Sequence, residues 1–321
     1  MKLSVIIPIY KVEAYIERCA RALMMQTLDG VEYIFVDDCS PDDSMKVLQR
    51  ILSEYPDQQH VRILHHSQNR GLPAARNTGL DAATGDYVFH CDSDDYLEPD
   101  ALQAMYEAAR KSDADIVYCD WILTYPQRER YMRCPAYETP EDALRGLLHG
   151  TMKYNVWNKL VKRDLYNEDL SIRFPEGHGM GEDMTMILLF ARAKRVAYLP
   201  KGIYHYVRQN ENAFTAVRSE SSYADLLFNA SRVIEGLYGK VSDEDLACFK
   251  LNVKFPFLIS DQSKDFERWQ QWFPEANAYI PKHGVSRRAR FLELAAARQQ
   301  YWLLKLYYFF IHKAVYGIIL R

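Results

Sequence analysis

Short apolar runs alternate with helical patterns over the first 123 residues of the chain. Apolar side chains recur every three or four positions in the helical patterns, as in Ile16, Ala20 and Leu23, which places them on one helix face. The runs between them are predominantly apolar, which is typical of buried parallel strands. We predict such strands at 3–9, 31–36, 61–64 and 87–91, and a further strand at 115–123. This alternation predicts an α/β fold with a mainly parallel sheet flanked by helices.

The rest of the chain follows a different pattern. A polar connection after residue 124 leads to a predicted helix at 141–149. Residues 216–281 carry further helical patterns but no motif that we can name. We therefore predict a first domain over 1–215 and a helical C-terminal extension over 216–321.

Polar and aromatic side chains follow three of the predicted strands. In sheets of this kind, ligands bind beyond the carboxyl ends of the strands, so these side chains are expected to form a site. A single Asp after a strand usually starts a turn, but here three strand ends bring polar groups to one edge. The residues are Pro8 and Tyr10 at the end of the first strand, Asp37 and Asp38 after the second, and Asp92 and Asp94 after the fourth.

The fourth strand is followed by three carboxylates within four positions, Asp92, Asp94 and Asp95. Like charges this close are tolerated only with a cation or with raised pKa values. The chain has no G-x-G-x-x-G after its first strand and no G-x-x-x-x-G-K-S/T, which argues against a dinucleotide site and a P-loop. An Asp-x-Asp pair that binds Mg²⁺ or Mn²⁺ together with a substrate diphosphate fits best, because these hard cations prefer oxygen ligands.

Composition and charge restrict the partners. The 321 residues are 48% apolar and 26% charged, as in ordinary soluble globular proteins. A net charge of −3 argues against nucleic acid as a partner. From residue 282 onward, however, eight Lys and Arg stand against one acid, Glu293. This basic tail is expected to have a partner of its own.

The cysteines and the apolar runs bear on the location of the protein. Six cysteines are scattered without a C-x-x-C pair or zinc spacing, which favours a reduced cytosol. The apolar run at the N-terminus is too short for a signal peptide. No stretch of about 18 uncharged apolar residues occurs, so no membrane-spanning helix is predicted.

Four sequence blocks carry a family resemblance. They are SVIIPIYKVEAYIERC, YIFVDDCSPDDS, NRGLPAARNTGLDAATGDYVFHCDSDDYLEP and GMGEDMTM. In order and spacing, over about residues 3–215, they resemble the inverting family 2 glycosyltransferases of the GT-A fold. Lys11 departs from the pattern, since the family often has Asn there. The resemblance implies a nucleotide-sugar half at 1–123 and an acceptor half at 124–215.

The resemblance also implies roles in binding the sugar donor. Pro8, Tyr10 and Asp38 would line the pocket for the base, usually uracil, and the ribose. Asp92 and Ser93 would lie at the nucleotide, and Asp94 would bind the metal that bridges the diphosphate. Three residues have two interpretations each. Glu13 would lie at the ribose or be an acid in the first turn of a helix, and Arg76 would lie at the phosphates or pair with an acid. Asp95 would belong to the metal site or, as we prefer, be a turn or helix-cap residue.

The acceptor half contains the implied catalytic base, Asp183. This carboxylate would take the proton of the acceptor hydroxyl, with Glu182 beside it on the acceptor or phosphate side. Trp157 and Lys159 would face the acceptor, or Trp157 would be core and Lys159 solvated. Two further residues follow the same resemblance: His205 near the metal, unless it is structural, and Arg208 at the phosphates.

The basic tail has an amphipathic pattern. One stripe holds cationic and tyrosine residues and the other holds apolar ones, which suits a membrane surface; packing on the protein itself is the alternative. The cationic and tyrosine stripe consists of Arg298, Tyr301, Lys305, Tyr308, His312 and Tyr316. The apolar stripe consists of Trp302, Leu303, Leu306, Phe309, Phe310 and Ala314.

Taken with the resemblance, the sequence predicts a metal-dependent inverting transferase that uses a UDP-sugar. Its expected acceptor is a saccharide, free or lipid-linked, in bacterial surface polysaccharide or lipopolysaccharide synthesis. The expected location is cytoplasmic, peripheral on the inner face of the plasma membrane. A non-catalytic nucleotide-sugar-binding protein is the alternative.

Overall fold

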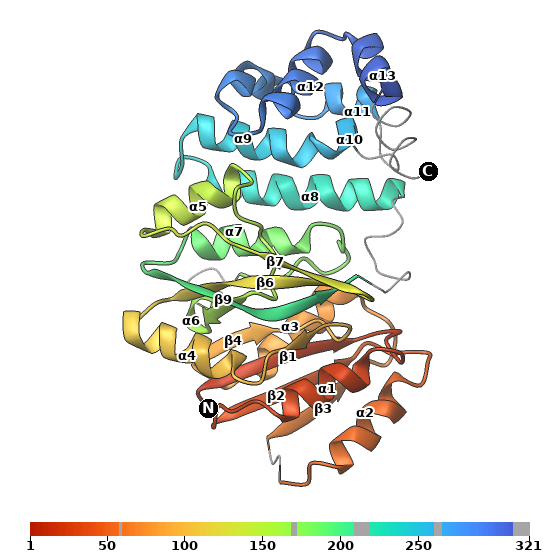
Figure 1. Ribbon diagram of the computed structural model, residues 1–321, viewed down its shortest axis with the longest axis vertical. Coiled ribbons are helices and arrows are strands. Elements are labelled where there is room, and N and C mark those ends of the chain that lie inside the picture. The colour runs from red at the N-terminus through yellow and green to blue at the C-terminus, as the bar shows by residue number, and fades with distance from the viewer. Residues whose placement is uncertain (58–59, 168–171, 209–218, 260–264, 311–321) are drawn as a thin grey trace. The chain divides into compact units, whose positions relative to one another are not determined.

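The computed structural model describes residues 1–57, 60–167, 172–208, 219–259 and 265–310. The chain forms two compact units (Figure 1). The first comprises Met1–Leu144 and Tyr154–Gly236, and the second comprises Arg145–Lys153 and Leu237–Arg321. Each unit is described by itself below.

The first unit is built on a nine-stranded sheet in the order β3-β2-β1-β4-β8-β6-β9-β5, with β7 paired to β6. The first four strands run parallel to one another, β8 is antiparallel to β4, and β9 is parallel to β6. The strands are β1 (Leu3–Ile9), β2 (Val31–Asp37), β3 (Val61–His65), β4 (Tyr87–His90), β5 (Tyr96–Leu97), β6 (Ile116–Tyr125), β7 (Arg128–Met132), β8 (Lys159–Lys162) and β9 (Val196–Val207).

Helices flank this sheet, so the predicted α/β fold is confirmed. Helices α1 and α2 pack side by side, and α3 packs on β1 and β2 (Figure 1). A side chain at Gly79 of α3 would collide with Ile6 of β1, which is why glycine stands there. The helices of this unit are α1 (Ile16–Met24), α2 (Ser44–Ser53), α3 (Leu72–Ala82), α4 (Ala101–Ser112), α6 (Asp164–Asn167), α7 (Thr185–Phe190) and α8 (Glu220–Leu237), while α5 (Pro140–Leu148) extends into the second unit.

The sequence pattern explains the strand order. Every residue of β1 is buried, including Ser4, as expected for a predominantly apolar central strand between β2 and β4. The edge strand β3 has no fully buried residue: Arg62 and His65 are exposed and the other three are half-buried. The parallel register pairs Ile9 with Asp37 and Ile6 with His90. The residues that follow β1, β2 and β4 therefore come together at one edge of the sheet.

The second unit is helical. Its buried polar centre pairs His283 Nδ1 with Glu293 Oε1 at 2.8 Å, while Lys254 Nζ donates to Asn277 Oδ1 at 2.6 Å. Its elements are α9 (Asp243–Lys254), α10 (Pro256–Ile259), α11 (Phe266–Gln271), a 3₁₀ helix at Pro274–Lys282, α12 (Arg287–Ala297) and α13 (Tyr301–Phe310). None of the helices in the described ranges is long and apolar enough to cross a membrane.

The prediction of one continuous amphipathic stripe in the tail is wrong at its start. Helix α12 ends at Ala297, and Gln299 adopts a left-handed backbone with φ of 57° before α13 begins. Arg298 therefore does not share a helix with Lys305. Trp302, Leu306, Phe309 and Phe310 are exposed on α13, whereas His312, Ala314 and Tyr316 lie outside the described residues.

Candidate active site

The acidic segment after β4 forms a tight turn. Asp95 closes it, because its backbone N–H donates to the carbonyl of Asp92 at 3.1 Å. The Asp95 carboxylate is buried and accepts hydrogen bonds from Tyr204 Oη at 2.7 Å and from the Val207 N–H at 2.8 Å. Burial, with Asp94 and Asp92 nearby, raises the pKa of Asp95 well above its usual value. The reading of Asp95 as a turn residue is therefore incomplete, since its side chain also attaches the turn to β9.

Arg76 of α3 places a buried positive charge beside these acids. Its Nη2 lies 3.1 Å from Asp92 Oδ1 and 4.0 Å from Glu182 Oε1. This confirms that it pairs with an acid. Its Nε and Nη1 are buried and meet no hydrogen-bond partner within the described ranges. The guanidinium therefore has two donors that no described residue satisfies, and contact with the phosphates stays a prediction.

Glu182 and Asp183 come directly after Gly181, whose φ of 89° a side chain would strain. Burial raises the pKa of Glu182 well above its usual value, and the neighbouring Asp183 adds to the rise. Burial also raises the pKa of Asp183, while Arg76 opposes the rise. Asp183 Oδ1 is buried without a hydrogen-bond partner among the described residues. An uncommitted carboxylate oxygen with a raised pKa suits a group that accepts a proton.

Helix α8 holds the loop that carries this pair. Asp225 accepts from His178 Nδ1 at 3.0 Å and from the Gly179 N–H at 3.1 Å. The fully buried Asn229 donates to the carbonyl of Met180 at 3.1 Å. Neither Asp225 nor Asn229 was among the predicted site residues, although two polar residues four positions apart on one helix face are a usable signal.

Asp38, after β2, organises the loop that leads to α3. Its Oδ1 accepts from His66 Nδ1 at 2.6 Å and from the Arg70 N–H at 2.8 Å. Its Oδ2 accepts from Asn69 Nδ2 at 2.9 Å and from the Gly71 N–H at 2.8 Å. Both oxygens thus have protein partners, and contact with a base stays a prediction.

The other residues predicted at the nucleotide lie along the same edge. Pro8 and Ser93 are buried, whereas Tyr10 is 40% exposed, with Lys11 Nζ 5.2 Å from its ring centre. Lys11 has a φ of 55°, a conformation that Asn adopts more readily, which explains the family's preference there. Glu13 lies before α1 and accepts from the N–H of Asp43, the residue that precedes α2.

Trp157 and Lys159 are both buried. Trp157 is 6% exposed and stacks on the rings of Tyr204 and Tyr206, with centroids 4.6 and 5.3 Å away. Lys159 Nζ donates to the carbonyl of Asn155 at 2.7 Å, and burial lowers its pKa to about 8. The alternative of a solvated Lys159 is wrong, and the alternative of Trp157 as a core residue agrees with its packing.

His205 and Arg208 belong to β9 and its end. His205 is buried, with Nε2 at 2.9 Å from Glu98 and Nδ1 at 3.1 Å from Thr124. A metal role of His205, which stays a prediction, would require these contacts to open. Arg208 is exposed at the carboxyl end of β9, and its contact with phosphates likewise stays a prediction.

Comparison with known proteins identifies the family. The model of the family described as Glycosyl transferase family 2 matches residues 4–180. This segment holds the three strand ends, Arg76 and the turn at 92–95. The chain is a family 2 glycosyltransferase. It is therefore an enzyme, and the alternative of a non-catalytic binding protein is set aside.

Similar proteins cover most of this glycosyltransferase. EpsJ of Bacillus subtilis, a glycosyltransferase, is 31% identical over 272 residues, which are 80% of this chain and 77% of EpsJ. Poly(ribitol-phosphate) beta-glucosyltransferase of Bacillus spizizenii is 27% identical over 90% of this chain and 46% of its own. The crystal structure of S. aureus TarS in complex with UDP-GlcNAc superposes with a TM-score of 0.70 at 20% identity, over 93% of this chain and 90% of that one. This likeness shows the GT-A type of fold.

The carboxylate oxygens available as metal ligands in this glycosyltransferase fit a metal ion that is bound mainly through the substrate. The acids at the turn, Asp92 and Asp94, are hard oxygen donors. Within the described ranges, no group of three or more His, Cys, Asp or Glu residues is placed to hold a metal ion. A cation here would thus take one or two carboxylates and complete its shell with diphosphate and water, as Mg²⁺ and Mn²⁺ commonly do.

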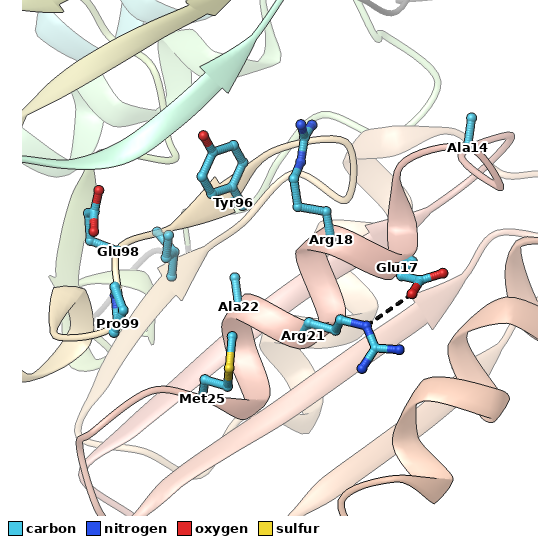
Figure 2. Close-up of a pocket in the computed structure, with 10 residues that line it drawn as sticks. Ala14, Glu17, Arg18, Arg21, Ala22, Met25, Tyr96, Glu98 and Pro99 are labelled. Atoms are coloured by element: carbon cyan, nitrogen blue, oxygen red, sulfur yellow. Dashed lines mark hydrogen bonds and ion pairs between the residues drawn. The ribbon is translucent and has the colours of Figure 1, made fainter. Parts of the chain in front are cut away.

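A separate groove of about 610 Å³ lies between α1 and the segment 96–99 (Figure 2). In it, Arg18 lies over the ring of Tyr96 at 4.7 Å from the ring centre. Arg18 Nη2 also donates to the carbonyl of Asp94 at 3.3 Å. None of the predicted site residues lines the groove, but Arg18 supports the acidic turn from this side.

Proposed function

We propose that this glycosyltransferase moves a sugar from a UDP-sugar to a saccharide acceptor with inversion at the anomeric carbon. The observation that carries the proposal is Asp183, whose Oδ1 is buried without a partner among the described residues, next to Arg76 and Asp92. The presence of UDP-GlcNAc in the structure of TarS, a protein of the same fold, supports a uridine nucleotide as donor.

The proposed reaction is a single displacement. Asp183 takes the proton of an acceptor hydroxyl, whose oxygen forms a bond to the anomeric carbon. The bond from that carbon to the diphosphate oxygen breaks on the opposite face, and UDP leaves with the electron pair. One carboxylate suffices as base. Burial raises the pKa of Asp183 above that of an ordinary Asp, which makes its carboxylate a stronger base toward a hydroxyl proton.

A divalent cation, Mn²⁺ or Mg²⁺, is proposed at Asp94. When bound, it would neutralise charge on the leaving diphosphate. Asp92 would face the ribose, and Arg76 would hold Asp92 in place through its 3.1 Å ion pair. The unpartnered Nε of the same guanidinium would be available to a phosphate oxygen.

The proposed acceptor belongs to bacterial surface polysaccharide synthesis. The similarity to a beta-glucosyltransferase that acts on poly(ribitol-phosphate) supports this class of acceptor. Trp157 and Lys159, with Glu182, would shape the acceptor side from behind, since all three are buried.

A peripheral position on the inner face of the plasma membrane is proposed as well. On α13, Trp302 is 64% exposed and Phe309 52% exposed, on one helix face. Arg287 and Arg288 at the start of α12 are also exposed. Exposed aromatic side chains together with cationic ones suit the surface of an anionic bilayer.

The proposed donor is tested with a panel of nucleotide sugars. Each UDP-sugar and GDP-sugar is incubated with the protein and Mn²⁺, and slow hydrolysis is followed by release of the nucleotide. We expect release of UDP from at least one UDP-sugar, and we expect this release to stop when the metal is chelated. Turnover of GDP-sugars alone, or turnover indifferent to chelation, would contradict the proposed donor or the proposed metal, respectively.

A further inference from the structure

One buried hydroxyl joins both ends of the acidic turn to β9. Tyr204 lies within β9 and is fully buried. Its Oη donates to Asp95 Oδ2 at 2.7 Å and accepts from the Asp92 N–H at 3.1 Å. Asp94, the proposed metal ligand, lies between these two residues in the chain. The hydroxyl thus fixes the backbone at Asp92, before Asp94, and the side chain of Asp95, after Asp94.

Other bonds make the attachment of the turn stronger. The second oxygen of Asp95 accepts from the Val207 N–H at 2.8 Å, so β9 holds this carboxylate at two points. From α1, Arg18 Nη2 reaches the carbonyl of Asp94 at 3.3 Å. Asp92 and Asp94 repel each other while no cation is bound, and a backbone fixed in this way keeps them from moving apart.

The ring of Tyr204 has a second set of neighbours. It stacks on Trp157, with centroids 4.6 Å apart and an interplanar angle of 16°. It also lies 6.4 Å from the ring of Phe89 in β4. These contacts use only the ring, so removal of the hydroxyl alone would separate the support of the turn from the packing of the aromatic cluster.

We propose that Tyr204 is a positioning residue, which holds the Asp92–Asp95 turn in the geometry that binds the donor diphosphate and its metal. The proposal rests on the proposed function, because it takes Asp92 and Asp94 as the donor-binding acids. Tyr204 acts through Asp92 and Asp95. Without its hydroxyl, the Asp92 N–H and one oxygen of Asp95 lose their partner in a dry environment, and the turn relaxes to satisfy them.

The test compares two variants, Tyr204→Phe and Tyr118→Phe. Tyr118 is a matched control, because it is fully buried and its hydroxyl also bridges two groups, donating to the carbonyl of Pro135 at 3.0 Å and accepting from the Tyr137 N–H at 2.8 Å. UDP is titrated calorimetrically into each protein over a series of Mn²⁺ concentrations. Tyr204→Phe should bind UDP about tenfold more weakly and require more Mn²⁺, because the buried Asp92 N–H and Asp95 oxygen both lose the hydroxyl as their partner.

Two further variants check that the effect runs through Asp95. Asp95→Asn should weaken UDP binding in the same way. The double variant Asp95→Asn with Tyr204→Phe should bind UDP less weakly than the sum of the two single effects predicts, because both changes disrupt the Tyr204–Asp95 hydrogen bond. UDP and Mn²⁺ titrations of Tyr204→Phe that match those of Tyr118→Phe would overturn the proposal. If the unmodified protein binds UDP equally well with and without Mn²⁺, the metal role of Asp94 fails, and the UDP affinities alone decide the role of Tyr204.

Discussion

Arg76 is a fully buried cation of the candidate active site, and its charge acts on three acids. It pairs with Asp92, and its charge opposes the rise that burial causes in the pKa values of Glu182 and Asp183. A buried charge that loses its partner is strongly destabilising. A single side chain therefore affects both the stability of the site and the proton affinity of the proposed base.

Replacement of Arg76 by Gln should change the pH dependence of transfer. Without the guanidinium, the pKa of Asp183 should rise further. Because the base must be ionised to accept a proton, the acidic limb of the kcat profile should move to higher pH. Unfolding in denaturant should also show a loss of about 3–5 kcal/mol.

The control for this variant is Arg70→Gln. Arg70 belongs to the same unit, but its guanidinium pairs at 2.8 Å with the exposed Glu176, and such pairs contribute about 0–1 kcal/mol. Its pH profile should match that of the unmodified enzyme. An acidic limb that stays in place in Arg76→Gln would mean that Arg76 does not act on the base.

At the scale of elements, helix α8 fixes the loop that precedes the proposed base. Asp225 and Asn229 lie one turn apart on α8 and hold the loop at His178, Gly179 and Met180. Arg232, a further turn along, donates to Thr185 Oγ1 at 2.7 Å. The glycines give the loop its freedom, and α8 removes that freedom in the folded protein.

Asn229→Ala should therefore lower turnover more than donor binding. The loop carries Asp183 rather than the proposed nucleotide contacts, and a displacement of about 1 Å at a catalytic group can cost as much as 10²-fold in rate. We expect kcat to fall about tenfold with UDP affinity unchanged. Asn252→Ala in the second unit is the control, since its amide also donates to a backbone carbonyl, that of Leu148 at 2.9 Å. Equal effects of the two variants on kcat would refute the role of α8.

The strands that carry the site were predictable because a local run of mainly apolar residues indicates a buried strand. β1 has the predicted bounds, and β2, β3 and β4 agree with their apolar runs to within one residue. The edge position of Asp38 and Asp92 followed from the strand ends alone. Local signals were enough because the inner strands β1, β2 and β4 pair with neighbours on both sides, and the edge strand β3 still has apolar residues at its half-buried positions.

The supporting contacts were not predictable in the same way. Tyr204 and Asp95 are 109 residues apart in the sequence and meet only because β9 pairs with β5. The burial of Lys159 likewise depends on the surrounding sheet rather than on its own segment. The break at Gln299 also has no strong local signal, since Gln rarely adopts a left-handed backbone. Such features follow from long-range packing, which a local pattern does not contain.

At the scale of the whole molecule, the exposed apolar face of α13 distinguishes the second unit. Trp302, Leu306 and Phe309 all lie on this face, and exposed apolar patches of this kind mark interaction sites. The buried Leu304 attaches the helix to its unit. Substitution of the exposed residues should thus leave the fold intact.

The double variant Trp302→Ser with Phe309→Ser should lose affinity for anionic liposomes. The proposed contact buries both rings at the bilayer surface, so co-sedimentation with phosphatidylserine-containing vesicles should fall several-fold while UDP affinity stays the same. Tyr238→Ser is the control, because Tyr238 is an aromatic residue that is 81% exposed outside α13. Unchanged co-sedimentation of the double variant would contradict the membrane proposal and would favour a protein partner for this face.

The central claim is that Asp183 is the catalytic base, and Asp183→Asn tests it most directly. If Asp183 were only a residue of the 3₁₀ helix Glu182–Met184, Asn would replace it with little effect, because Asn has nearly the same size and Asp183 makes no capping hydrogen bond there. If Asp183 is the base, the amide of Asn cannot take the proton in its place. The transfer rate should then fall by about 10²-fold or more, with UDP affinity unchanged. Asp243→Asn, in the first turn of α9, is the control and should transfer normally. Near-normal transfer by Asp183→Asn, with normal UDP binding, would contradict the account.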